Sequence, residues 1–254
     1  MDTDRLNKRM QELTDSGEMV AGTLMISQNG EKIFEGKWGY LSQEEKIPVQ
    51  YDTIFRIMSM TKVLTAVGVM KLYEEQKIEL DDEVARYLPE YRNRMVRQSD
   101  GTEVKATREL TIRDLLTHSS GFGMSMESDR RLDELSETED RIADRVLRWS
   151  SIPLDFQPGT KTGYSPKGNF DLLARIIEVV SGQSFEKYMK ERIFEPLEMK
   201  DTCFHLDDTQ KKRLMQLYQT VDGRHVNVTG SEVDLDGFAK IGSNYACGSG
   251  GVYS

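Results

Sequence analysis

The stretch Ser59-Met60-Thr61-Lys62 opens a long apolar run without proline, which continues through Val63, Leu64, Ala66, Val67, Val69, Met70 and Leu72. Apolar residues on almost all sides of a helix are typical of a helix packed inside a protein. Residues three apart lie on one helix face, so Lys62 can lie beside Ser59. The pattern therefore predicts a buried helix with a hydroxyl and an amine together at its start.

The pair Ser59 and Lys62 has a chemical use. A serine hydroxyl is a weak nucleophile until a neighbouring base takes its proton. An amine in an apolar setting gives up its own proton more readily than one in water, and can then act as that base. The first-turn N–H groups and the helix dipole also favour negative charge at this end of a helix. Although S-x-x-K is common on protein surfaces, a buried helix behind it favours a catalytic pair.

Composition limits the partners. The chain has 254 residues, 30% of them charged, and a net charge of -9. Nucleic acids and anionic membranes select basic patches, so we expect neither as a partner. No apolar stretch approaches the length of a membrane span, and the charged N-terminus shows no secretory signal. We expect a cytoplasmic protein with a small-molecule substrate; the oligomeric state is left open.

The cysteines and histidines predict no metal site and no disulfide framework. The chain has only Cys203 and Cys247, neither in a C-x-x-C pair. Its three histidines, His118, His205 and His225, are too far apart in the sequence to form a metal cluster by spacing. We expect two reduced structural thiols, no metal and no cofactor.

The order of elements mixes α and β. An amphipathic helix pattern that breaks near Gly17 precedes a strand pattern at 21–27, expected to be buried, and a return strand at 32–40 across the hairpin signal Asn29-Gly30. Helix patterns follow after Ser59, after the capping residue Thr111, within 125–150, and at 170–180 before a glycine stop. This order predicts an α+β fold, with helices segregated around a sheet.

Three regions are expected along the chain. Residues 1–56 form an N-terminal helix and the first strands, residues 57–200 form a helical region that carries the chemical motifs, and residues 201–254 return towards the sheet.

Tyr164 is the candidate for a second proton-transfer group. It lies in the segment 153–166, which holds three of the six prolines and leads directly into the 170–180 helix pattern. Rigid turns of this kind hold a side chain in one place. A phenol ionises near ~10 when unperturbed, and a neighbouring cation such as Lys62 lowers that value. On spacing alone, an ordinary half-buried tyrosine remains the alternative.

Four stretches together resemble the serine β-lactamase and penicillin-binding-protein superfamily, nearest to class C β-lactamase-like hydrolases and family VIII carboxylesterases. They are Phe55 to Lys62, Leu110 to Gly121, Gln157-Pro158-Gly159 through Tyr164-Ser165, and Ile193 to Thr202. The resemblance covers nearly the whole chain. It implies a β-lactamase/transpeptidase-like fold, with an antiparallel sheet flanked by helices plus a helical subdomain.

The same resemblance implies an acyl-enzyme mechanism without a cofactor. Ser59 would be the nucleophile, Lys62 would assist its deprotonation, and Tyr164 would carry the proton to and from the leaving group. Which of Lys62 and Tyr164 is the primary base stays open. Met60, Phe122 and Met124 could line an apolar acyl pocket. His118 is expected to be a structural hydrogen-bonding residue at the end of a helix, because no G-x-S-x-G elbow is present.

Two departures from the family pattern bear on function. Class C β-lactamases end the tyrosine motif in asparagine, whereas this chain has Pro166, which favours an esterase over β-lactam recognition. Lys161-Thr162-Gly163 matches the letters of the family's third motif, but it directly precedes Tyr164 and is expected to be a coincidence. We therefore expect the third motif, the second oxyanion donor and the C-terminal strands to be missing from this chain.

These observations predict a serine hydrolase that acts on a small ester or amide, either a carboxylesterase or a β-lactamase-like enzyme. One alternative is a truncated member of the same fold that is weakly active or only binds. A second alternative is a penicillin-binding protein that resembles a D-Ala-D-Ala peptidase.

Overall fold

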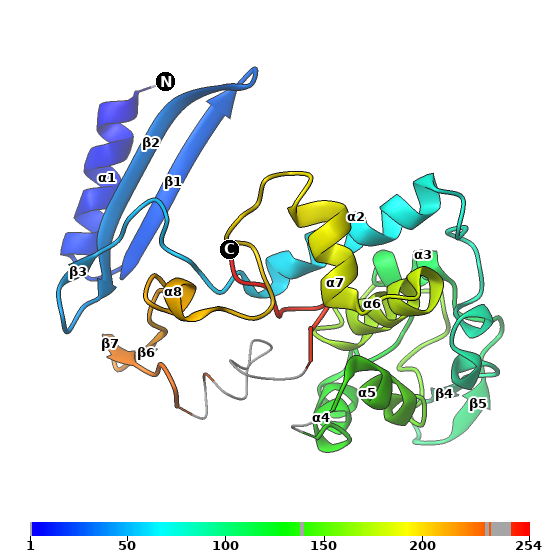
Figure 1. The fold of residues 1–254 in the computed structure, drawn as a ribbon. Coiled ribbons are helices and arrows are strands. Elements are labelled where there is room, and N and C mark those ends of the chain that lie inside the picture. The colour runs from blue at the N-terminus through cyan, green and yellow to red at the C-terminus, as the bar shows by residue number, and fades with distance from the viewer. Residues whose placement is uncertain (1, 138–139, 232–233, 235–244) are drawn as a thin grey trace. The chain divides into compact units, whose positions relative to one another are not determined.

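A computed structural model describes residues 2–137, 140–231, 234 and 245–254. The chain divides into two compact units (Figure 1). One comprises Met1–Arg56 with Leu206–Gly237, and the other comprises Ile57–His205 with Phe238–Ser254. In the described part of the chain, no helix is both long enough and apolar enough to cross a membrane.

The first unit is built on an antiparallel hairpin. Strands β1 (Ala21–Gln28) and β2 (Glu31–Ser42) are joined by Asn29-Gly30, whose φ values of 53° and 83° are those of a type I′ turn. The short β3 (Ile47–Pro48) pairs with β2, so the strand order is β1-β2-β3. Helix α1 (Thr3–Asp15) runs beside β2 (Figure 1), where Trp38 Nε1 donates to Asn7 Oδ1 at 2.9 Å. The predicted helix and hairpin are confirmed.

The prediction that the first strand is buried is wrong. Along β1, half-buried residues alternate with exposed ones, and Met25 is 66% exposed. An antiparallel sheet can pack one face and leave the other in water, which accounts for the alternation. Among the described residues β1 pairs only with β2.

Three short elements complete the first unit. They are α8 (Asp208–Lys211) and the antiparallel pair β6 (Tyr218–Val221) and β7 (Arg224–Asn227). A buried ion pair, Arg56 Nη2 to Asp234 Oδ2 at 2.9 Å, ties the end of the first stretch of this unit to its second.

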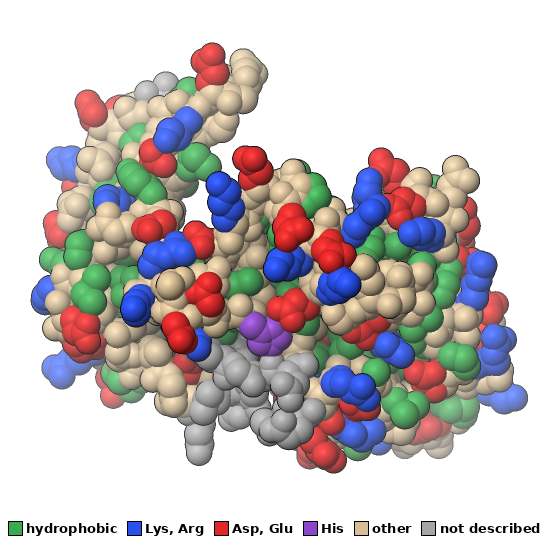
Figure 2. All heavy atoms as spheres, in the orientation of Figure 1, with side chains coloured by type: hydrophobic (Ala, Val, Ile, Leu, Met, Phe, Trp, Pro, Cys, Tyr) green, Lys and Arg blue, Asp and Glu red, His purple; other side chains and the backbone are tan. Residues whose placement is uncertain are grey.

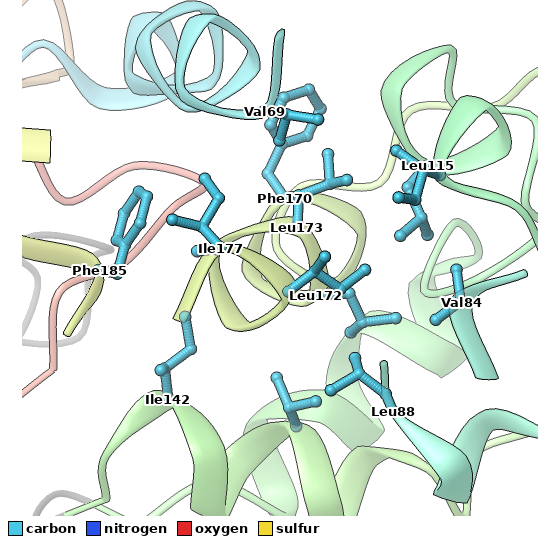
Figure 3. Packing of buried hydrophobic residues seen from close by; sticks show 14 of the residues in the cluster. Val69, Val84, Leu88, Leu115, Ile142, Phe170, Leu172, Leu173, Ile177 and Phe185 are labelled. Carbon is cyan, nitrogen blue, oxygen red and sulfur yellow. The ribbon is translucent and has the colours of Figure 1, made fainter. Parts of the chain in front are cut away.

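The core of the second unit surrounds α6 (Gly168–Ser181) (Figure 3). Around it lie four helices: α2 (Thr61–Glu74), α3 (Ile112–Leu116), α5 (Ile142–Trp149) and α7 (Phe185–Met189). The buried face of α6 holds Phe170, Leu172, Leu173, Ile176 and Ile177. Gly182, with φ 69°, ends the helix at the predicted glycine stop.

The remaining elements of this unit are short. They are η1 (Met58–Met60), η2 (Val84–Arg86), η3 (Pro89–Tyr91), β4 (Met95–Arg97), β5 (Glu103–Lys105), α4 (Met126–Glu134) and η4 (Lys190–Phe194). The predicted cap at Thr111 is confirmed, because its side chain accepts from Asp114 N and the Asp114 side chain accepts from Thr111 N.

Helix α2 differs from its prediction. The sequence pattern predicts burial on all sides, but Val63, Val67 and Met70 are 65%, 42% and 41% exposed, and Met60, just before the helix, is 63% exposed. The side that faces the core carries Thr61, Lys62, Thr65, Gly68, Val69 and Leu72. The prediction is therefore wrong for one face, because composition shows how apolar a helix is but not which side meets the core.

Charges are mixed over the surface. Figure 2 shows acidic and basic side chains interspersed on the visible face. Several form exposed ion pairs, such as Arg113 Nε with Asp81 Oδ1 at 2.7 Å. Exposed pairs of this kind contribute little to stability, because water screens the attraction between the two charges.

Candidate active site

Ser59 lies in a tight turn at the start of α2. Met58, Ser59 and Met60 form the single turn η1, and α2 continues directly from Thr61. Met58 has φ 47°, a left-handed conformation that strains a residue with a side chain. Such strain persists where the surrounding structure enforces it, often at functional sites. The turn leaves Ser59 exposed at the surface.

Lys62 and Tyr164 both reach the Ser59 hydroxyl. Lys62 Nζ donates to Ser59 Oγ at 3.2 Å, and the Tyr164 hydroxyl donates to Ser59 Oγ at 2.6 Å. Tyr164 is 105 residues away in the sequence. The convergence expected of the three groups is therefore present in the structure, within the reach that proton transfer requires.

Two backbone carbonyls orient the Lys62 amine. The side chain is 6% exposed, and Nζ donates to Pro166 O at 2.8 Å and to Ser249 O at 2.7 Å. A carbonyl can only accept, so both contacts use N–H bonds of the amine. The two bonds hold Nζ within hydrogen-bond distance of Ser59 Oγ.

Tyr164 is held over the Lys62 amine while its hydroxyl points at Ser59. Its ring centroid lies 5.1 Å from Lys62 Nζ, and 53% of the residue is exposed. Burial alone would raise the pKa of Tyr164, but hydrogen bonds with Ser59 and Lys62 and the Lys62 charge together lower it. A phenol whose pKa is lowered exchanges a proton more easily near neutral pH.

The ring of His118 packs against the ring of Tyr164. Its ring centroid lies 5.1 Å from that of Tyr164, and its Nδ1 accepts the Ser165 N–H at 3.2 Å. Nδ1 therefore needs its lone pair. Burial, reinforced by the Lys62 charge, lowers the pKa of His118, so the imidazole is neutral at pH 7. The expectation of a hydrogen-bonding residue just beyond a helix end is confirmed, since α3 ends at Leu116.

The segment before Tyr164 is an irregular loop tied to the end of α3. Gly159 N donates to Ser119 O at 2.8 Å, and Gly163 N donates to His118 O at 3.0 Å. Lys161 and Thr162 are exposed, and no strand runs through this loop. Lys161-Thr162-Gly163 is thus not a strand beside the serine. This agrees with the expectation that its match to the third motif is a coincidence.

The three residues suggested for an acyl pocket lie in different settings. Met60 is 63% exposed next to Ser59. Met124 is half-buried, with its sulfur 3.2 Å from the point where a Cβ on Gly163 would lie, just before Tyr164. Phe122 is 0% exposed and packs edge-to-face on Tyr91 in the core. The structure thus brings Met60 and Met124 close to the site and places Phe122 beneath it.

Sequence reasoning missed the groups that hold Lys62. The carbonyls of Pro166 and Ser249 have no side-chain signature, because every residue carries a carbonyl. The run Gly248-Ser249-Gly250-Gly251 was the available signal, since glycines cluster where backbone must approach another element closely. Among the described residues, no group of three or more His, Cys, Asp or Glu side chains could hold a metal ion.

Comparison with known proteins identifies the family of this chain. A family model described as Beta-lactamase matches residues 6–254, and the chain belongs to that family. Esterase EstB from Burkholderia gladioli is 30% identical over 199 residues, which are 73% of this chain and 47% of that protein. Protein Rv1367c from Mycobacterium tuberculosis is 28% identical over 231 residues, or 86% of this chain and 56% of that protein.

Solved structures share the fold. The hydrolase EstCE1, described as having promiscuous acyltransferase activity, superposes with a TM-score of 0.79 at 23% identity, over 99% of this chain and 68% of that one. The expected β-lactamase/transpeptidase-like α+β fold is therefore confirmed. The chain spans about half the length of the curated relatives it matches.

Proposed function

We propose that this chain is a serine hydrolase that forms an acyl-enzyme at Ser59 on a small ester or amide. The observation that carries the proposal is the meeting of Lys62 Nζ and the Tyr164 hydroxyl at Ser59 Oγ, at 3.2 and 2.6 Å. The esterase among the relatives supports the same reaction class.

In the acylation step, Ser59 Oγ attacks the substrate carbonyl carbon while its proton passes to the Lys62–Tyr164 pair. The carbonyl electrons move onto the oxygen, where a backbone N–H at the start of the helix can stabilise the charge. When the tetrahedral intermediate collapses, the bond to the leaving group breaks, and the leaving oxygen or nitrogen takes a proton from Tyr164. Water then repeats the sequence and releases the acid, which restores the Ser59 hydroxyl.

Pro166 favours an ester as the substrate. It stands where class C β-lactamases carry an asparagine, and a proline side chain offers no hydrogen-bond donor to an amide. In this chain the position contributes its carbonyl, which accepts from Lys62 Nζ at 2.8 Å. We expect p-nitrophenyl acetate to be hydrolysed in preference to a cephalosporin.

A second candidate is a member of the family that binds substrate but turns it over weakly. The exposed apolar side chains Val63, Val67 and Met70 on the helix that carries Lys62, with Met60 just before it, favour this candidate. Ser59 is itself exposed to water, and water weakens the electrostatic stabilisation of charge that develops at it. Under this candidate Ser59 would still be acylated, but release would be slow.

Intact-mass labelling with a serine-directed fluorophosphonate tests the main proposal. The parent chain should gain one adduct, which peptide mapping places at Ser59, and Ser59→Ala should gain none. Ser151→Ala removes an exposed serine outside the site and should label like the parent chain. Equal labelling of Ser59→Ala and the parent chain would exclude Ser59 as the nucleophile. A steady-state assay with p-nitrophenyl acetate then separates turnover from slow release.

A further inference from the structure

A fully buried carboxylate lies behind Lys62. Asp171, in the first turns of α6, is 0% exposed. Its Oδ1 accepts the Ser249 N–H at 3.0 Å and lies 3.5 Å from Cys247 Sγ. Among the described residues no basic side chain forms an ion pair with it. Burial raises the pKa of Asp171 to about 6, against the opposing effect of the bond from Ser249. Such a group reduces stability, so its presence calls for another reason.

The carboxylate anchors a tight turn. Gly251 N donates to Cys247 O at 3.1 Å, which closes the turn Cys247–Gly251. The turn lies directly on α6, because a Cβ on Gly248 would be 2.5 Å from Phe170 O and 2.7 Å from Ala174 Cβ. Only glycine allows this approach.

Both ends of one peptide group in this turn are held. Thr65 Oγ1, from α2, donates to Gly248 O at 2.7 Å, and Asp171, from α6, accepts the N–H of the same peptide at Ser249. The next carbonyl along the chain is Ser249 O, which accepts from Lys62 Nζ at 2.7 Å. With one peptide plane held at both ends, the direction of the following carbonyl is restricted.

We propose that Asp171 is a positioning residue for the Ser59–Lys62–Tyr164 site, because it holds the Cys247–Gly251 turn so that the Ser249 carbonyl directs the Lys62 amine at Ser59. The inference rests on the proposed function. Thr65 holds the other end of the same peptide and shares the role. Buried ionisable groups that reduce stability concentrate at functional sites, where geometry matters more than stability.

The test compares four variants by steady-state hydrolysis of p-nitrophenyl acetate. Asp171→Leu keeps the branched shape of the side chain, with a larger volume, but has no acceptor, so kcat should fall by about 10²-fold with little change in KM, since small misplacements of a reacting group cost that much. Asp171→Asn keeps an oxygen for the Ser249 N–H and should recover most of the loss. Thr65→Val should lower kcat about tenfold, because it frees the other end of the peptide. Val84→Ala truncates a buried side chain of η2, outside the turn and the site, and should leave kcat unchanged.

Thermal unfolding of each variant separates positioning from packing. A purely structural role predicts that kcat follows stability and that Val84→Ala and Asp171→Leu lose activity alike, which would overturn the inference. So would an unchanged kcat in Asp171→Leu. If Asp171→Leu does not fold, Thr65→Val decides: an unchanged kcat overturns the inference, and a loss with KM retained supports it. Hydrolysis that persists in Ser59→Ala would instead overturn the proposed function, and the inference with it.

Discussion

Helices α2 and α6 pack against each other, but α6 buries apolar side chains whereas the first turns of α2 bury polar ones. α6 turns its apolar side inward: Leu172, Leu173, Ile176 and Ile177 are all 0% exposed. α2 turns polar residues inward at its first turns, with Thr61 and Thr65 at 0% and Lys62 at 6%, while Val63 is 65% exposed. The buried side of α6 therefore forms the core, whereas the buried side of α2 carries residues of the candidate site.

The polar residues on the buried face of α2 are tolerated there because each has a hydrogen-bond partner. Thr61 Oγ1 accepts the Val252 N–H at 3.2 Å, Thr65 Oγ1 donates to Gly248 O at 2.7 Å, and Lys62 donates to two carbonyls. A buried polar group is tolerated when it is hydrogen-bonded and costly when it is not. Hydrogen-bond partners, and not hydropathy, therefore determine which side of α2 faces inward.

The largest effect is expected where the inward face of α2 performs chemistry. Lys62→Ala and Tyr164→Phe should each lower kcat by about 10²–10⁴-fold, the usual contribution of a positioned proton-transfer group. The double variant should lose much less than the product of the two, because groups that act as a unit are not additive. Steady-state kinetics on p-nitrophenyl acetate measure all three variants.

Lys161→Ala is the matched control for that cycle. Lys161 is exposed in the loop before Tyr164 and should have no effect on kcat. A loss equal to the product of the single losses would rule out a shared proton relay. A large loss in Lys161→Ala would show that Lys161-Thr162-Gly163 does act as a motif.

The next largest effect is expected from truncating side chains on the two helices, which should change the free energy of unfolding by different amounts. Ile177→Ala on α6 should lower the free energy of unfolding by about 2–5 kcal/mol, because it removes buried methyl groups and leaves a cavity. Val63→Ala on the exposed side of α2 should change it by no more than about 0.5 kcal/mol. Urea denaturation measures both. If Val63→Ala costs as much as Ile177→Ala, the outer face of α2 is covered in solution and the comparison fails.

The Asp171 carboxyl makes stability depend on pH. Its pKa is raised from 3.8 to about 6 by burial, and the charged or titratable groups that act on it are Arg145 from α5, Lys62 from α2 and Cys247. A raised pKa means that the folded chain binds the proton more tightly than the unfolded chain. Stability from this group is therefore present below pH 4 and is lost as pH rises through 6.

The loss amounts to about 3 kcal/mol, since each pKa unit is worth about 1.36 kcal/mol. Asp171→Asn should remove it, so that the variant gains stability relative to the parent chain between pH 4.5 and 7.5. Urea denaturation at the two pH values gives the difference, in which titrations elsewhere cancel. A difference that is the same at both values would mean that Asp171 is not protonated in the folded chain at low pH.

The smallest expected change in the free energy of unfolding comes from one hydrogen bond on the buried face of α2. Thr65→Val keeps the shape of the side chain but leaves the buried Gly248 carbonyl without its donor. We expect unfolding to become easier by about 1–3 kcal/mol, the cost of an unsatisfied buried group. Thr160→Val is the control, because the Thr160 hydroxyl donates to Gln157 O at an exposed position. Denaturation midpoints that shift equally in both variants would contradict the role given to Thr65.

Local elements could be predicted from sequence because their rules act over a few residues. The Asn29-Gly30 hairpin, the Thr111 cap and the stop at Gly182 each depend on backbone conformations that neighbouring residues select. The nearness of Ser59 and Lys62 follows from helical spacing alone. The failures, at β1 and at the outer face of α2, are both cases where hydropathy shows that a segment is apolar but not how much of it is covered.

The sequence by itself therefore determined the main helices, the hairpin and the family, together with the serine–lysine pair. The tertiary structure alone decided that Tyr164 reaches a serine 105 residues away, and that Pro166 and Ser249 present carbonyls to Lys62. It alone brought Asp171 to the turn behind that lysine. The physical reason is that the role of a backbone carbonyl or a buried aspartate depends on the group that packs beside it. That group comes from a distant segment, so no spacing rule within one segment can identify it.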